Sequence, residues 1–181
     1  MAITRIGPNQ SINLASNITG TLPVGNGGSG RTAVTGNVLQ VVNGNFGTEQ
    51  NISSTSYVNT AVTLNITPSS SSSKIMVVSA LNTDGYVNLS DNRQFYLRLN
   101  RDSTVLQYKQ IQIGGEKNPT NNYVYGSIDG SMCYLDSPST TSQVTYTVAA
   151  KVSNTGNNCN VRVNGTSSAG HSTLTLMEIS A

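Results

Sequence analysis

Charged residues are scarce in this chain. Asp, Glu, Lys and Arg make up 10% of its 181 residues, against about 25% in an average globular domain. The net charge is +2 with no concentrated basic stripe, so nucleic-acid binding is not expected. Arg93, Arg98 and Arg101 cluster at strand spacing, which indicates a solvated strand face. Low charge combined with many β-branched residues favours a folded β protein over a disordered chain.

Histidine and cysteine are also scarce. A single histidine, His171, excludes a histidine-based metal cluster, and Cys133, Cys159 and His171 lack the spacing of zinc ligands. No nucleophile motif surrounds a serine, so a Ser-His-Asp triad is not expected. Two cysteines are too few for a disulfide scaffold, and free cysteines in strands usually pack as small hydrophobes. Whether the two are bonded stays open. We expect no cofactor and no metal.

Long apolar runs are absent. The opening residues MAITRIGPNQ contain no apolar core after their single arginine, so they do not resemble a signal peptide. No segment approaches the roughly 18 apolar residues of a membrane span. We therefore expect a protein that is made soluble in the cytoplasm of the producing cell, without membrane insertion.

The eight acidic residues do not suggest an enzyme. Glycoside cleavage needs two carboxyl groups about 5–10 Å apart in a cleft. Five acids lie next to Gly, Asn, Ser or Pro, which predicts turns: Asp84, Asp91, Asp102, Asp129 and Asp136. Glu178 differs because it lies in an apolar strand, where a buried carboxylate needs a partner. We expect a structural ion pair with Arg93, Arg98 or Lys74.

In much of the chain, apolar and polar residues alternate with a period of two. In 143–152 the inward set is Val144, Tyr146, Val148, Ala150 and Val152, and only Ala149 blurs the pattern. About nine such strands and no helical period predict an antiparallel β-sandwich, a jelly roll or a related fold. The expected strands are 38–42, 57–66, 74–81, 93–101, 104–113, 123–128, 132–135, 143–152, 159–163 and the terminal segment. Expected turns and loops are 43–44, 69–73, 82–91, 102–103, 114–122, 129–130 and 154–158.

Two of these strands are apolar on both faces. They are 74–81 and the terminal segment, in which Leu174 and Leu176 point one way and Met177 and Ile179 the other. In a two-sheet sandwich only the inward faces are buried, so either an extra layer or another subunit covers the second face, and we favour the subunit. The predicted subunit-packing residues are Ile75, Val77, Leu174, Leu176, Met177 and Ile179.

The first 36 residues differ from the rest. They carry apolar residues every few positions but too few to form a core alone, which favours an extended arm over a floppy tail. At roughly 3.3 Å per residue the arm could reach on the order of 100 Å. The glycine-rich segment 25–30 is the expected hinge. The arm's apolar residues are Ile3, Ile6, Ile12, Leu14, Ile18, Leu22 and Val24. We therefore divide the chain into an attachment arm, 1–36, and a knob, 37–181.

The segment LPVGNGGSGRT, residues 22–32, resembles the LPxxNGGTG element near the start of many bacteriophage tail-fibre and virion proteins. The phrases TLNITPSSSSSKIMV, YLDSPSTTSQVTYTVAAKV and STLTLMEI resemble the distal domains of such proteins. This resemblance implies a homotrimeric jelly-roll knob of the tumour-necrosis-factor type, held on the virion by its N-terminal arm. The chain departs from the family because it has no long fibre shaft.

Two functions follow from this resemblance. The knob is either a short tail fibre or spike for host attachment, or a capsid decoration or head-fibre protein whose arm binds the capsid. Partners would be other virion proteins and a host-surface glycan or protein. The loops 82–91, 114–122 and 154–158 are candidate contacts. Five surface tyrosines could stack on sugars or pack between subunits, and we favour packing: Tyr86, Tyr96, Tyr108, Tyr123 and Tyr125.

Overall fold

The computed structural model describes residues 36–88, 94–112, 120, 123–153, 160–164 and 171–181. These residues all belong to one unit, Gly36–Ala181. They form twelve β-strands and no helix, which confirms the all-β prediction. The described part of the chain accordingly has no helix suited in length and apolarity to crossing a membrane. The predicted arm lies outside the described residues.

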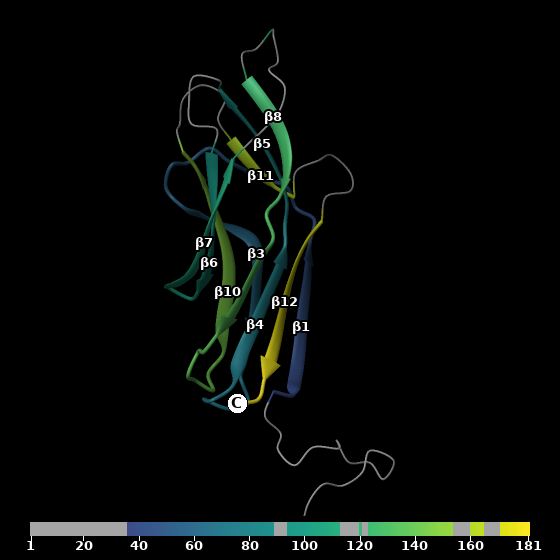
Figure 1. Cartoon of the computed structure of the whole chain (residues 1–181), viewed down its shortest axis with the longest axis vertical. Coiled ribbons are helices and arrows are strands. Elements are labelled where there is room, and N and C mark those ends of the chain that lie inside the picture. Colours follow the sequence, from purple (N-terminus) through teal and green to yellow (C-terminus); the bar gives the residue numbers. More distant parts are fainter. Residues whose placement is uncertain (1–35, 89–93, 113–119, 121–122, 154–159, 165–170) are drawn as a thin grey trace, which may run out of the picture. The chain divides into compact units, whose positions relative to one another are not determined.

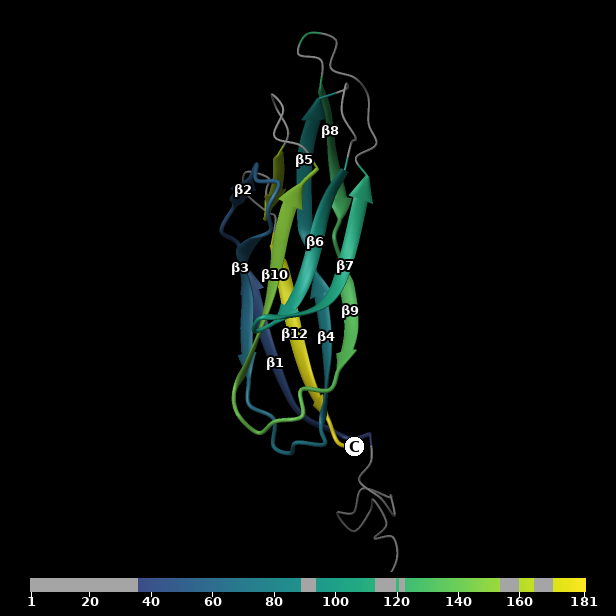
Figure 2. The ribbon, with the colours of Figure 1, turned by 90° about the vertical axis from the view of Figure 1, so that its left-hand side faces the viewer.

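The strands are paired in antiparallel sheets. One sheet has the order β1-β12-β4-β9 and a second has the order β3-β10-β6-β7. These two sheets face each other as in a sandwich, and the second lies in front of the first in Figure 2. The strands of the first sheet are β1 (Val38–Phe46), β12 (Ser172–Ile179), β4 (Lys74–Ala80) and β9 (Met132–Asp136). Those of the second are β3 (Val58–Ile66), β10 (Val144–Val152), β6 (Gln94–Arg101) and β7 (Thr104–Gln112).

A third sheet continues the first. Its order is β2-β11-β5-β8, with β2 (Gln50–Ile52), β11 (Asn160–Val163), β5 (Asn82–Asn88) and β8 (Tyr123–Asp129). Each of these strands is the neighbour along the chain of the matching strand in the first sheet. For example, β5 follows β4 after Leu81 alone. The third sheet therefore extends the first toward the upper end of Figure 1.

Strand β10 lies at the centre of the second sheet, between β3 and β6. Its predicted inward residues are all buried, from Val144 to Val152, so the period-two prediction is confirmed. Strand β6 contributes Phe95, Leu97 and Leu99, all fully buried as predicted. From the first sheet, β4 and β12 contribute alternate residues to the same core. The alternation of β-branched and polar residues thus positions the sandwich core.

Two predicted turns are wrong. Asn43-Gly44 does not end a strand, because β1 runs through it and pairs with Thr175 and Leu174 of β12. A Cβ at Gly44 would lie 2.6 Å from Cζ of Phe46, so glycine leaves room for that ring. Asp129-Gly130 does not form a hairpin either, because β8 pairs with β5 whereas β9 pairs with β4.

Segment 82–88 was predicted as loop but forms β5. Its sequence, NTDGYVN, is polar and contains Asp-Gly, which is typical of a turn. The strand forms because β11 and β8 hydrogen-bond to its two edges. The turn predicted at Asp102-Ser103 is confirmed, since it joins β6 to β7 and Asp102 has a φ of 48°.

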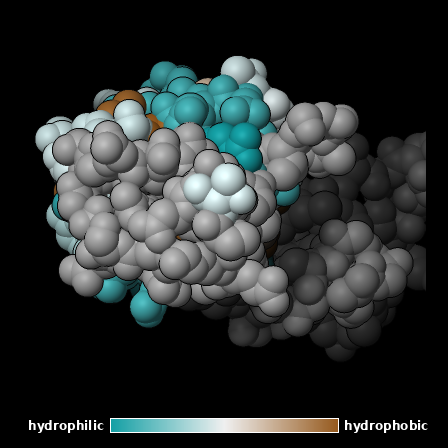
Figure 3. Space-filling model, turned by 90° about the horizontal axis from the view of Figure 1, so that it is seen from above, coloured by the Kyte–Doolittle hydropathy of each residue, from teal (hydrophilic) through white to brown (hydrophobic). Residues whose placement is uncertain are grey.

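The described unit has two distinct ends. Gly36 and Ser180 are joined at one end by a hydrogen bond of 2.8 Å from the Gly36 N–H to the Ser180 carbonyl. The C-terminus marks this end in Figure 1, and β5, β8 and β11 lie toward the other end. Viewed from that upper end, the described surface that is visible is mostly hydrophilic, with only small hydrophobic areas (Figure 3).

Candidate functional site

The outer face of the β1-β12-β4-β9 sheet is apolar. Four large hydrophobic side chains on it are strongly exposed: Val38 at 54%, Leu39 at 47%, Val41 at 57% and Leu135 at 45%. Four more are partly exposed beside them, namely Met76, Val78, Met177 and Ile179. We call these eight residues the apolar face. Proteins rarely expose such a contiguous set of apolar side chains unless the surface contacts something else.

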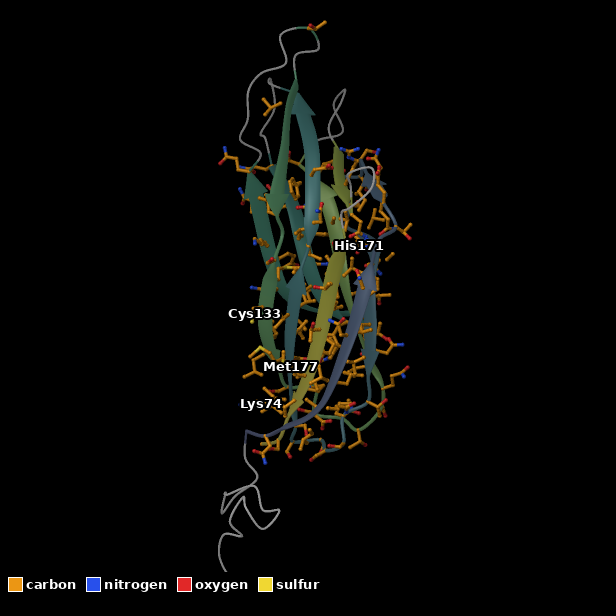
Figure 4. All side chains as sticks on the ribbon, turned by 90° about the vertical axis from the view of Figure 1, so that its right-hand side faces the viewer. Lys74, Cys133, His171 and Met177 are labelled. Atoms are coloured by element: carbon orange, nitrogen blue, oxygen red, sulfur yellow. The ribbon has the colours of Figure 1, made fainter. Side chains whose placement is uncertain are left out.

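The strand register makes this face continuous. One row across the sheet consists of Val41, Met177, Met76 and Leu135, each paired with the next. Val38 and Ile179 pair in a neighbouring row. Figure 4 looks onto this side of the unit, with Met177 and Cys133 labelled on it. All four strands of the sheet therefore contribute to one surface.

The six predicted subunit-packing residues divide between two faces. Ile75, Val77, Leu174 and Leu176 are fully buried in the core of the single chain. Met177 and Ile179 point to the opposite side and belong to the apolar face. The predicted alternation of the last strand is therefore confirmed, but only its outward residues are available to a partner. The exposed residues of β1 and Leu135 of β9 were not predicted, because single exposed valines and leucines carry no distinctive pattern.

Cys133 lies beside the apolar face. Its thiol is exposed and free, with Sγ 3.6 Å from Sδ of Met76. Cys159 lies outside the described residues. His171 is exposed, as predicted, and its ring lies against Gly47, where an added Cβ would come 2.6 Å from Cε1. Cys133 and His171 are both labelled in Figure 4.

Glu178 is buried as predicted, but it forms no ion pair with Arg98 or Lys74, and Arg93, the third expected partner, lies outside the described residues. Among the described residues no cation pairs with it, and its partners are neutral donors. Oε1 accepts hydrogen bonds from the Ser69 backbone N–H at 2.7 Å and the Ser69 hydroxyl at 2.6 Å. Oε2 accepts one from Gln40 Nε2 at 2.6 Å. Burial by itself would raise the pKa of Glu178, but these hydrogen bonds outweigh it and lower the pKa to about 2.

Asp136 also has a role that the turn prediction missed. It ends β9, is 5% exposed, and accepts two hydrogen bonds of 2.7 Å from Arg101 Nη1. The Tyr146 hydroxyl donates a third, also at 2.7 Å. Burial and this donation raise the pKa of Tyr146 well above its ordinary value. The three side chains therefore form a hydrogen-bonded bridge between the two facing sheets, and the role of Asp136 is structural.

Asp84 repeats this pattern in the third sheet. It is fully buried in β5 and accepts hydrogen bonds from Arg162 of β11 at 2.7 and 2.8 Å. Asp102 is the acid that behaves as predicted, since it lies in a turn and accepts the Thr145 N–H at 3.0 Å. Asp91 and the side chain of Asp129 lie outside what the structure describes.

The described residues form no catalytic constellation that we recognise. They contain no group of three or more His, Cys, Asp or Glu that could hold a metal ion. The arm residues from Ile3 to Val24 lie outside the described part, as do the side chains of Tyr86, Tyr123 and Tyr125. Of the three candidate contact loops, the first, 82–91, forms strand β5 over residues 82–88, and its residues 89–91 are not described. The second, 114–122, is described only at Thr120, and the third, 154–158, is not described.

The candidate site is therefore a contact surface on an all-β, sandwich-like unit. Comparison with protein-family models and with curated proteins gave no match for this chain.

Proposed function

We propose that this chain is a bacteriophage virion structural protein, a homotrimeric knob that serves as a short tail fibre or spike in host attachment. The observation that carries the proposal is the apolar face. A chain whose surface is otherwise rich in Ser, Thr, Asn and Gln exposes a four-strand apolar sheet face. Packing against further copies of the chain would remove that face from water at about 25 cal/mol per Å².

The strand order supports a jelly-roll knob. If each strand of the third sheet is counted with its chain neighbour in the first, the twelve strands reduce to eight. When these eight strands are numbered again from 1 to 8 along the chain, the sheet orders are 1-8-3-6 and 2-7-4-5, and the first and last strands are adjacent. This order is the one expected of two four-stranded sheets in a jelly roll, so it supports that topology. The sequence resemblance to phage virion proteins points to the same architecture.

The two ends of the unit support attachment through the arm. Residue 36, where the predicted arm joins the knob, lies at the same end as the C-terminus. Strands β5 and β8 lie toward the other end (Figure 1). An arm bound to another virion protein would thus leave the far end to face outward. Capsid decoration is the second candidate, in which the predicted arm, residues 1–36, binds capsid subunits instead. Quantitative mass spectrometry of particles separates the two, since a tail protein is present in far fewer copies than a capsid coat.

Self-association tests the proposal directly. We expect the full-length protein to be a trimer by light scattering, and Val41→Lys to shift it toward monomer because the charge would be buried in the interface. Val105→Lys, on the opposite sheet and 36% exposed, is the matched control and is expected to leave the trimer intact. Cys133 provides a second measurement, since trimer formation is expected to slow its labelling by maleimide. A wild-type monomer with freely reactive Cys133 would contradict the proposal.

A further inference from the structure

The outer face of the β3-β10-β6-β7 sheet carries aromatic and cationic side chains. In the register, Lys151 pairs with Tyr96 and Ala149 pairs with Arg98, which pairs in turn with Tyr108. Tyr57 immediately precedes β3, whose Asn59 pairs with Ala149 from the other side. We call Tyr57, Tyr96, Arg98, Tyr108 and Lys151 the aromatic–cationic patch. Figure 2 shows this sheet in front, so the patch and the apolar face lie on opposite sheets.

The five side chains are linked by contacts that centre on Tyr57. The Arg98 guanidinium carbon lies 4.3 Å from the centroid of the Tyr57 ring. Lys151 Nζ lies 5.0 Å from the centroids of both Tyr57 and Tyr96. The Tyr57 and Tyr108 rings are 5.9 Å apart and tilted by 47°. These distances are within the range of cation–π attraction, so the rings hold both cations in place.

The two positive charges have no carboxylate partner among the described residues. The ion pairs among the described residues use Arg101 and Arg162, and none includes Arg98 or Lys151. Arg98 Nε is buried and has no hydrogen-bond partner in the described part of the chain. A ring that stacks on the flat face of a guanidinium leaves the in-plane N–H groups free to donate. The patch therefore offers two fixed cations to a negatively charged ligand.

This charge makes the patch unsuitable for ordinary packing between subunits. Burying two cations without counter-charges would cost several kcal/mol per ion after relaxation. A ligand that brings its own carboxylate removes that cost, because arginine binds carboxylates through two parallel hydrogen bonds. Tyr108 is 62% exposed and presents an apolar ring beside these cations. The C–H face of a sugar can pack on such a ring.

We propose that the aromatic–cationic patch binds a carboxylate-bearing saccharide, such as a uronic or sialic acid residue of a surface glycan. Arg98 and Lys151 bind the carboxylate, and Tyr108 packs against the sugar ring. The proposal deepens the attachment role proposed above and rests on it for its biological meaning. Since the patch lies on the opposite sheet from the apolar face, a trimer formed through that face leaves the patch accessible.

Calorimetric titration of the full-length protein tests this. The probes are a hexuronate oligosaccharide, a sialylated trisaccharide, the neutral disaccharide lactose and inorganic phosphate. We expect saturable binding of at least one acidic saccharide, about tenfold or more tighter than lactose or phosphate. Which acid binds identifies the source of the carboxylate. Added salt is expected to weaken the binding because it screens the attraction between the cations and the carboxylate.

Variants locate the site. Lys151→Gln and Tyr108→Ala are expected to raise Kd by about tenfold each, and Arg98→Lys by a similar factor because it keeps the charge but loses the fork. Lys74→Gln, an exposed lysine of β4 on the other sheet, is the matched control and is expected to change nothing. Thermal melting of each variant checks that it is folded.

The proposal is overturned if neither acidic saccharide binds at about 10 mM, or if lactose or phosphate binds equally well. It is also overturned if Lys74→Gln weakens binding as much as Lys151→Gln does. None of these outcomes bears on self-association or on incorporation into particles. A failure of the saccharide proposal therefore stays distinct from a failure of the proposed virion role.

Discussion

A buried carboxylate can be stabilised without a cation, as Glu178 illustrates. Its two oxygens accept three hydrogen bonds, two from Ser69 and one from Gln40. These bonds connect β12 to β1 and to the serine-rich turn after β3. The serine tract therefore does more than close a loop, because its first residue supplies two of the three donors. Charge-assisted bonds of this kind are about twice as strong as neutral ones.

The lowered pKa of Glu178 predicts a specific loss of stability in acid. The folded-state pKa of about 2 lies below the ordinary value of 4.5, so ionised Glu178 stabilises the fold above that value. This contribution decreases as the pH falls from about 4.5 to about 2. We expect Glu178→Gln to lower the free energy of unfolding by roughly 2 kcal/mol at neutral pH, and by much less near pH 2. Urea denaturation at both pH values measures the difference.

Glu49→Gln is the matched control for this prediction. The Glu49 side chain is 46% exposed and lies 3.9 Å from Arg162, an arrangement that contributes little. We expect a change below about 0.5 kcal/mol at either pH. An equal destabilisation by Glu178→Gln at both pH values would show that the carboxylate charge is not what stabilises the turn.

At the scale of the strand, β12 separates a core position from a position on the apolar face in two adjacent residues. Leu176 is fully buried in the sandwich core, and Met177 next to it lies on the apolar face. We expect Leu176→Asp to abolish folding, because an unpaired charge would be buried. Met177→Asp is expected to fold but to associate weakly. Circular dichroism and light scattering on the two variants measure these outcomes, and two equally unfolded variants would contradict the separation.

The strands that the sequence predicted correctly are those in which side-chain alternation and burial agree. In β10 every predicted inward residue is buried, and in β6 the same holds for Phe95, Leu97 and Leu99. The prediction failed where tertiary pairing overrides local turn chemistry. Asp84-Gly85 lies inside β5 because Arg162 compensates the buried aspartate, and such a partner 78 residues away leaves no local signal.

The candidate site was predictable only in part for a related reason. A strand apolar on both faces, such as β4 or β12, indicates that something covers the second face. The sequence pattern does not show which exposed residues of β1 and β9 complete that face, since this depends on register. The cation–π contacts of Tyr57 depend on register as well. The predicted tyrosines included Tyr96 and Tyr108 but not Tyr57, at the centre of the patch.

For the whole molecule, the core of the described unit predicts that the arm is dispensable for folding. Its buried hydrophobic residues all lie between Ile52 and Leu176. We expect a protein lacking residues 1–30 to melt cooperatively at nearly the wild-type temperature and to remain a trimer. We also expect it to be missing from particles, because the arm is the proposed anchor. Mass spectrometry of particles assembled with both forms present measures this competition. Equal incorporation of the truncated chain would locate the anchor in the knob, whereas loss of folding would show that the core needs residues 1–30.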